Sequence, residues 1–186
     1  MAGERVRPIR RVITGHDASG RSVVEADAIA SCVMIMAGTE DFAVTDLWRL
    51  PRMPADNTKV GDPCTLPITL APPAGGAVLR IVQFPPDRNY VGKWDPGAGF
   101  ASLGDSGAQA IDHAGPHEAM HRTQSVDFAL VMEGEIWSVL DTDERPLRAG
   151  DVLIQRGTNH AWSNRSDAMA IVAFVLIDAL PIVRQR

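Results

Sequence analysis

Short hydrophobic runs separated by glycine-, proline- and polar-rich turns dominate this chain, and no stretch keeps a helical period. The pattern is densest after Glu118, where strands are predicted at residues 127–132, 136–140, 151–155, 160–164 and 169–177. Val, Ile, Leu and Phe predominate in these runs, and such side chains suit a pleated, half-buried surface. Many short strands with closely spaced turns predict an all-β fold, closed as an antiparallel barrel or jelly roll that removes exposed edges.

Further strands are predicted before this dense region, at residues 9–14, 21–25, 31–36, 42–50 and 77–84. The first two runs flank the turn sequence at residues 15–20 and predict a hairpin. Residues 51–76 contain six prolines, which remove ladder donors and end helices, so this segment is predicted to cross the surface. We expect residues 1–74 to form an N-terminal β extension with a proline-rich connection, and residues 75–186 to form the barrel, within one structural domain.

A long segment rich in glycine and proline, residues 85–115, interrupts the strands. Loops of this length inside a compact domain are usually functional or disordered. Trp94 and Phe100 lie within this segment, and such aromatic residues favour a packed lid. One turn of helix is predicted around residues 107–111.

Composition and charge narrow the classes of partner. The 186 residues suffice for one domain with a real core, and 45% hydrophobic and 22% charged residues are ordinary for a soluble protein. A net charge of -5 argues against a nucleic-acid partner, since the one local basic run, Arg5, Arg7, Arg10 and Arg11, is typical of a solvated end.

Targeting signals and cysteine pattern suggest a compartment. The first 20 residues lack the apolar core of a secretory signal, and the longest apolar run is too short to span a bilayer, so no membrane partner is expected. Cys32 and Cys64 lack the spacing of a metal or redox motif. We expect a cytoplasmic protein with reduced thiols.

Candidate chemistry gathers around two histidines. His121 and Thr123 face the same side of a strand, but Asp127 would lie about 20 Å from His121 if that strand continued straight. A shared site therefore requires the chain to fold back at residues 124–126. His160 must come from a third strand, with Trp162 on the same face as an aromatic wall. Two imidazoles and one carboxylate with open positions suit Fe(II), Mn or Zn.

The two histidine segments resemble the two motifs of the cupin superfamily, G(X)5HXH(X)3-4E(X)6G and G(X)5PXG(X)2H(X)3N. In the first, His121 matches the first His, Asp127 stands at the Glu position, and Gly134 follows at the right distance. In the second motif the matching positions are Gly150, Gly157, His160 and Asn164. The resemblance covers roughly residues 75–178 and is similar to small single-domain microbial cupins. It implies a cupin-type double-stranded β-helix, a jelly-roll barrel, which here would carry an N-terminal β-hairpin extension.

The resemblance also implies metal ligands, with departures. Family ligands carry over to His121, Asp127 and His160, which we predict as both the metal-binding and the catalytic residues of a site for Fe, Mn or Zn. Thr123 replaces the second His, whose place His117 could fill at an even offset. In the second motif Gln155 stands at the Pro position, and the spacing after Gly150 is one residue short.

Other readings of the same residues stay open. Without a metal, His121, Thr123, Asp127 and His160 would hydrogen-bond one another, and the carboxylate would raise the pKa of a neighbouring histidine. Predicted substrate contacts are Thr123, Trp162, Gln155 and Arg80. Arg80 could reach inward to hold a carboxylate, or point outward as an ordinary surface arginine.

The predicted function is a small-molecule-binding cupin, a metal-dependent enzyme acting on a carbonyl, enol or phenol-type substrate. Lyase or isomerase chemistry is favoured over dioxygenation. The alternatives are a non-catalytic, metal-free binding protein, which Thr123 favours, and a structural dimer module. Related cupins commonly dimerise by sheet extension, so the resemblance together with the spare hairpin at residues 9–25 predicts a homodimer.

Overall fold

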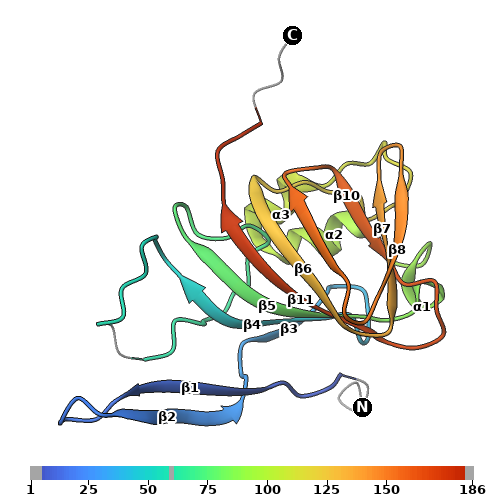
Figure 1. Cartoon of the computed structure of the whole chain (residues 1–186). Coiled ribbons are helices and arrows are strands. Elements are labelled where there is room, and N and C mark those ends of the chain that lie inside the picture. The colour runs from blue at the N-terminus through green and yellow to red at the C-terminus, as the bar shows by residue number, and fades with distance from the viewer. Residues whose placement is uncertain (1–5, 59–60, 183–186) are drawn as a thin grey trace.

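Two antiparallel sheets and a separate hairpin make up the structure, a computed structural model that describes residues 6–58 and 61–182 (Figure 1). The strands are β1 (Arg10–His16), β2 (Ser22–Ile29), β3 (Val33–Ile35), β4 (Ala43–Leu50), β5 (Ala77–Phe84), β6 (Ser125–Glu133), β7 (Glu135–Leu140), β8 (Glu144–Arg148), β9 (Val152–Arg156), β10 (His160–Ser163) and β11 (Ala170–Asp178). Three short helices, α1 (Asp87–Tyr90), α2 (Pro96–Ala101) and α3 (Gly104–Ala110), separate β5 from β6.

The larger sheet has six strands in the order β3-β4-β5-β11-β6-β9, and the smaller has three in the order β10-β7-β8. They enclose one hydrophobic core, as a jelly-roll barrel requires. The all-β, cupin-type prediction is therefore confirmed. Two strands that precede the predicted barrel boundary at residue 75, β3 and β4, also belong to the six-stranded sheet, which therefore begins at Val33.

Side-chain alternation explains how the larger sheet divides inside from outside. On β6 the side chains of Ser125, Asp127, Ala129 and Val131 are buried, whereas the positions between them are half-buried or exposed. Successive residues of a strand point to opposite faces, so the inward set carries both the apolar filling and the polar groups of the interior. Gly134 then turns the chain from one sheet to the other at a φ of +77°, where a side chain would also collide with the Met169 carbonyl oxygen.

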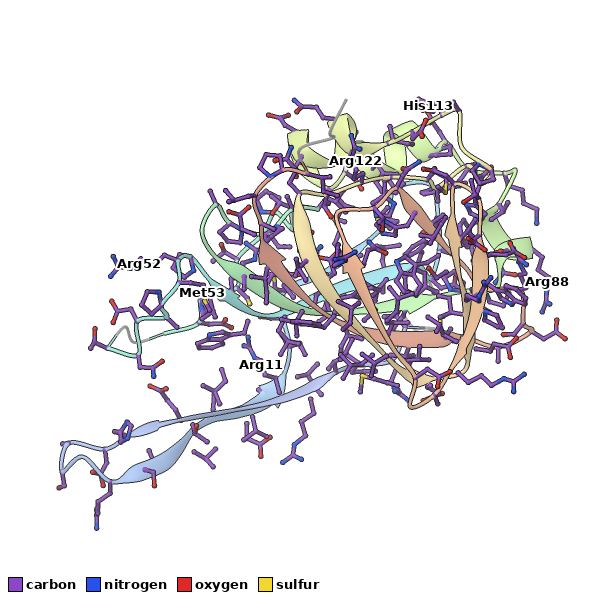
Figure 2. The ribbon with its side chains drawn as sticks, turned by 45° about the horizontal axis from the view of Figure 1, so that its top comes forward. Arg11, Arg52, Met53, Arg88, His113 and Arg122 are labelled. Carbon is purple, nitrogen blue, oxygen red and sulfur yellow. The ribbon has the colours of Figure 1, made fainter. Side chains whose placement is uncertain are left out.

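The predicted N-terminal hairpin is present as β1 and β2, which form a sheet of two strands by themselves. Arg11 lies on the side of the hairpin that faces the rest of the molecule and donates to the Leu47 carbonyl oxygen (Figure 2). The arginines of the predicted basic run bind carboxylates: Arg7 pairs with Glu133, Arg10 with Asp27 and Arg11 with Asp62. Arg5 lies outside the described residues.

The segment 85–115 is more helical than one turn, since it folds into α1, α2 and α3. Asp95 caps the start of α2 by accepting from the Ala98 amide. Trp94 and Phe100 are buried, as the packed-lid prediction required. Within the described residues no helix is long and apolar enough to cross a membrane.

Candidate active site in the barrel

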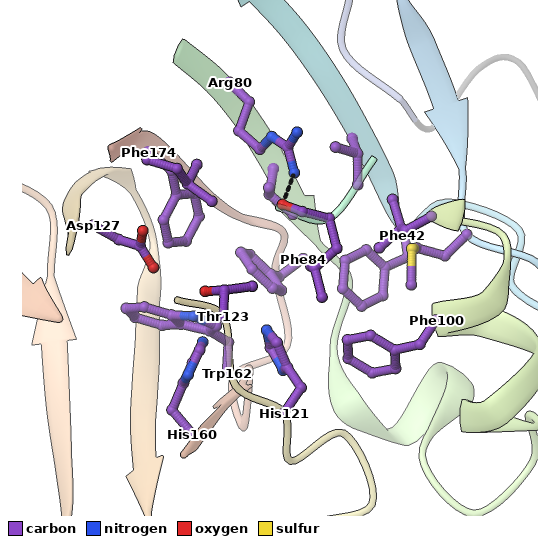
Figure 3. Close-up of a pocket in the computed structure, with 16 residues that line it drawn as sticks. Phe42, Arg80, Phe84, Phe100, His121, Thr123, Asp127, His160, Trp162 and Phe174 are labelled. Atoms are coloured by element: carbon purple, nitrogen blue, oxygen red, sulfur yellow. Dashed lines mark hydrogen bonds between the residues drawn. The ribbon is translucent and has the colours of Figure 1, made fainter. Parts of the chain in front are cut away.

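A mostly apolar cavity lies inside the barrel (Figure 3). It leaves about 90 Å³ for the centres of water-sized molecules, which is room for several waters or one small organic molecule. Its lining residues are Met36, Phe42, Val44, Leu70, Arg80, Val82, Phe84, Phe100, Leu103, His121, Thr123, Asp127, His160, Trp162, Phe174 and Leu176. The polar groups are few and lie at separate places on an apolar wall, as in sites that orient a small molecule.

The two motif histidines lie side by side in this wall. His121 follows the lid segment and His160 begins β10, and their backbones exchange two hydrogen bonds of 2.8 and 2.9 Å. Their ring centroids are 4.2 Å apart. Both residues line the cavity, so the predicted convergence of these two imidazoles is seen in the structure.

Local backbone contacts orient both rings in the same way. Nδ1 of His121 lies 2.9 Å from the Ala119 carbonyl oxygen, and Nδ1 of His160 lies 3.0 Å from that of Thr158. A carbonyl oxygen can only accept, so each Nδ1 carries the proton and each Nε2 is left with a lone pair. This tautomer presents Nε2 as the base or the ligand of each ring.

The Nε2 atoms of the two histidines differ in their partners. The Gln155 side-chain nitrogen lies 2.8 Å from both ring nitrogens of His160, and because Nδ1 carries the proton, the amide donates to Nε2. It donates more weakly to Oδ2 of Asp127 at 3.4 Å. Gln155 itself is buried between these two residues and is not part of the cavity wall. His121 therefore keeps the Nε2 lone pair that a bound molecule can reach.

Burial sets the charge of these groups. It lowers the pKa of His121 to about 4, against a small opposing effect of the Ala119 carbonyl. Burial lowers the pKa of His160 well below its usual value as well, and the neighbouring His121 lowers it further. Both rings are therefore neutral near pH 7. Burial raises the pKa of Asp127 to about 6, although hydrogen bonds from Ser125 and Gln155 and the charge of Arg80 oppose the rise.

The three predicted metal ligands line one cavity but do not form one coordination group. In the part of the chain that the structure describes, no three His, Cys, Asp or Glu side chains come together as an ion would require. The Gln155 amide lies between His160 and Asp127 and binds both. The structure thus has two adjacent imidazoles and a separate carboxylate. For one ion to bind all three, the Asp127 carboxylate would have to move into the position that the Gln155 amide occupies.

Arg80 points inward, which corrects the alternative of an outward surface arginine. Its side chain is buried and its Nε lies 3.0 Å from Oδ1 of Asp46. The guanidinium also donates to the carbonyl oxygens of Thr69 and Leu70, at 2.8 and 3.3 Å. Figure 3 shows it at the far side of the cavity from the imidazoles. With these bonds made, most of its donors are already used within the protein.

Three other predicted site residues have different surroundings: Thr123, Trp162 and His117. The Thr123 hydroxyl lies in the cavity wall and shares a hydrogen bond of 2.8 Å with the Ser125 hydroxyl. Trp162 forms the predicted aromatic wall, edge-on to His160 and to Phe174. His117 lies outside the cavity lining, and its Nδ1 accepts from the Ala119 amide.

Four phenylalanines of the wall were missing from the predicted site: Phe42, Phe84, Phe100 and Phe174. Phe100 belongs to α2 and its ring centroid lies 4.7 Å from that of His121, so the lid contributes directly to the site. Phe42 directly precedes β4, Phe84 ends β5 and Phe174 lies within β11, in apolar runs that are visible in the sequence. That signal does not say which apolar side chains border a void and which fill the core.

Comparison with known proteins agrees with this architecture. The chain is 35% identical to phomopsin biosynthesis cluster protein C' of Diaporthe leptostromiformis, over 95% of this chain and 82% of that protein. It is 27% identical to the cupin-domain-containing oxidoreductase srdB of Neurospora crassa, over 93% of this chain and 75% of that protein. The chain belongs to the cupin superfamily.

Other comparisons add context for this cupin. A solved cupin 2 conserved barrel domain protein from Salinispora arenicola CNS-205 is 15% identical, with a TM-score of 0.42 over 78% of this chain and 82% of that one. No protein-family model matches the chain. Membership confirms the resemblance carried by His121, His160 and Asn164. Asn164 has a structural role in this cupin, because its amide donates to the carbonyl oxygens of Phe84 and Ala168, both at 2.8 Å.

Proposed function

We propose that this cupin is an enzyme that binds a small ring-containing molecule in the barrel and activates its carbonyl, enol or phenol-type oxygen. One observation carries the proposal: two neutral imidazoles lie side by side in a cavity whose other walls are largely aromatic. Aromatic walls favour a flat, weakly polar molecule, and the imidazoles supply the polar end that would orient it.

His121 is the group best placed to act on such a molecule. Its Nε2 lone pair is available to the cavity, while that of His160 already accepts from Gln155. An enol or phenol hydroxyl would donate to Nε2 of His121, and this hydrogen bond draws the proton from the substrate oxygen and makes the bound molecule more electron-rich. Since burial disfavours a charged imidazole, the proton stays shared between the substrate oxygen and Nε2 of His121.

The relatives favour an oxidative outcome within this chemistry. Several are named cupin-domain-containing oxidoreductases, among them srdB of Neurospora crassa, and others are named as proteins of biosynthesis clusters. We therefore favour oxidation of the activated molecule by dioxygen, which takes two electrons and two protons and leaves as hydrogen peroxide, over the lyase or isomerase reaction suggested by the sequence alone. Arg80 is expected to complete the far wall without holding a substrate carboxylate, because Asp46 already pairs with it.

Turnover of a panel of ring-bearing enols, phenols and carbonyl compounds tests this function, with oxygen uptake followed alongside product formation. For a substrate that turns over, His121→Gln is expected to lower kcat by about 10²- to 10⁴-fold, the usual contribution of a positioned acid or base. His16→Gln, an exposed histidine of the hairpin, is the matched control and should leave kcat unchanged. Turnover that survives in His121→Gln would refute the assigned role.

A metal-dependent version of the same enzyme is the second candidate. It is favoured by buried oxygens without a hydrogen-bond partner beside the imidazoles, Oδ1 of Asp127 and Oε1 of Gln155. Metal analysis of protein purified without chelator decides between the two versions. Roughly stoichiometric iron, manganese or zinc that disappears in His160→Ala supports the metal-dependent version. A pocket that binds panel compounds without metal and without turnover would instead indicate a non-catalytic binding protein.

A further inference from the structure

Two arginines at one end of the barrel differ from the others because they lack a carboxylate partner. Within residues 6–58 and 61–182, every other arginine pairs with an aspartate or a glutamate. Arg122 and Arg156 form no ion pair with a residue of those ranges, and both line the same groove. The chain has a net charge of -5, so a shortage of carboxylates does not explain this. Two unpaired guanidinium groups in one groove indicate an anion site.

The positions of these arginines follow from the segments that build the inner cavity. His121 and Thr123 line that cavity, so Arg122 between them lies on the other side of the backbone and is exposed. In the same way Gln155 is buried inside, and the next residue of β9, Arg156, is exposed. The groove therefore lies on the outer side of the segments that carry the predicted site, and Thr123 borders both spaces.

The groove is far larger than the inner cavity. It leaves about 710 Å³ for the centres of water-sized molecules, against about 90 Å³ inside the barrel. Its walls are residues 122–126, the connection at 140–142, the connection at 156–159 and the segment 179–182 beyond β11. β11 ends beside the start of β6, which brings that last segment to the groove (Figure 1). A space of this size accommodates an organic molecule as well as a small ion.

The groove also has an exposed apolar wall. Leu180 and Ile182 line it and are 92% and 63% exposed. Val126 of β6 and Leu140 of β7 line it as well. An apolar body that fills the groove would remove these side chains from water, which is favourable in proportion to the area covered. The lining therefore suits a molecule that has an apolar body together with an anionic group.

Charge favours a carboxylate over a phosphate as that anionic group. The charged side chains of the described lining are Arg122, Arg156 and Asp141, so it carries one net positive charge. Asp141 already accepts from the Asn159 amide at 2.7 Å. One carboxylate balances that charge, whereas a phosphate monoester brings roughly -1.5 to -2 at pH 7. The described lining residues belong to strands and connections, so they offer a phosphate no helix N-terminus.

We propose that this groove binds an organic acid, whose carboxylate pairs with Arg122 and Arg156 and whose apolar body lies against the exposed wall formed by Leu180 and Ile182. Arginine presents a planar fork of donors that matches both oxygens of a carboxylate, and such charge-assisted hydrogen bonds are short and strong. The groove is separate from the space that the imidazoles line, so this site does not depend on the proposed activity.

Calorimetric titration with decanoate and with 2-naphthoate tests the site, since one probe has a flexible apolar body and the other a flat one. At least one of them should bind the wild type. Arg122→Gln combined with Arg156→Gln should raise its Kd by about tenfold or more, because the charge-assisted bonds are lost. Arg145→Gln is the matched control and should leave Kd unchanged, since Arg145 is an exposed arginine outside the groove that pairs with Asp143.

Two analogues of each probe test the charge of the ligand. The uncharged amides, decanamide and 2-naphthamide, should bind at least about tenfold more weakly than the acids. Decyl phosphate and 2-naphthyl phosphate should also bind more weakly. An amide that binds as well as its acid overturns the proposal in favour of an apolar site. A phosphate that binds as well or better overturns it in favour of a phosphate ester.

Amide NMR shifts locate the bound probe. The largest changes should lie at residues 122–126, 156–159 and 179–182, which form the groove. Leu180→Glu combined with Ile182→Glu places negative charge on the exposed wall and should weaken binding. Circular dichroism checks that each variant keeps its β-structure. The proposal is overturned if neither probe binds, if the double arginine variant keeps the wild-type Kd, or if the shifts are confined to the inner cavity around Phe174.

Discussion

Two polar clusters lie within the same apolar barrel, and they differ in whether their charged groups are paired with an opposite charge. At one side of the cavity, the carboxylate of Asp46 lies between the guanidinium groups of Arg49 and Arg80, at 2.8 and 3.0 Å. At the other side, His121 keeps a free Nε2, and Oδ1 of Asp127 has no hydrogen-bond partner.

This difference is the reason for assigning a structural role to the arginine cluster and the proposed function to the imidazole cluster. Groups buried with their partners stabilise the fold or at least cost little once paired. A buried carboxylate without an opposite charge beside it costs free energy, and a bound molecule or ion is one way in which such a group is completed. This contrast supports the proposal that the imidazole side is the reactive side and that the arginine side closes the cavity.

The largest effect should come from breaking the arginine cluster. Asp46→Ala leaves Arg80 buried without its carboxylate, and we expect the free energy of unfolding to fall by about 3–5 kcal/mol. Urea denaturation measures it. Asp27→Ala, which breaks the exposed pair with Arg10, should cost far less, because solvent screens an exposed ion pair. Equal costs for the two variants would contradict a structural role for Asp46.

The imidazole side should reveal itself in pH dependence. The pKa of Asp127 is raised from 3.8 to about 6, so the folded state binds this proton more tightly and loses stability as pH rises through that window. The pKa of His121 is lowered from 6.5 to about 4, so its effect has the opposite sign, and the two partly cancel between pH 4 and 6. Asp127→Asn removes the first effect alone.

The free energy of unfolding of Asp127→Asn, taken relative to that of the wild type, should therefore rise by about 3 kcal/mol as the pH is raised from 4 to 7. Chemical denaturation at several pH values, with chelator present, gives this difference directly. Parallel stability curves for the two proteins would show that Asp127 does not titrate in this range.

Gln155 links the two titrating residues, and its removal should have an intermediate effect. Gln155→Leu takes a donor from His160 and from Asp127, and we expect a loss of about 1–3 kcal/mol at pH 7. The loss should shrink at pH 5, where Asp127 is largely protonated and needs no donor. Denaturation at both pH values measures it, and a cost independent of pH would indicate a packing role.

The smallest effect is expected at Thr123. Thr123→Val keeps the shape but removes the hydroxyl that binds Ser125 at 2.8 Å, at a cost of about 1 kcal/mol. Because this hydroxyl already has a partner, kcat should change by no more than a few-fold. A large loss of kcat in a fully folded variant would make Thr123 a direct substrate contact.

Pattern and motif predicted much of this molecule. Alternation placed the strands and the hairpin, because side-chain direction in a strand depends on position alone. The motif spacing placed His121 and His160 in one site. The predicted three-ligand set depended further on Gln155, which the motif comparison marked only as a departure and which the structure places between His160 and Asp127.

The sequence by itself determined the β-class of the fold, the family resemblance and the two histidines, since each depends on local period or fixed spacing. Only the tertiary structure decided that Arg80 turns inward to Asp46, that the lid brings Phe100 against His121, and that two unpaired arginines share one groove. These outcomes depend on which segments, distant along the chain, come into contact in the folded protein, and the local sequence does not specify those contacts.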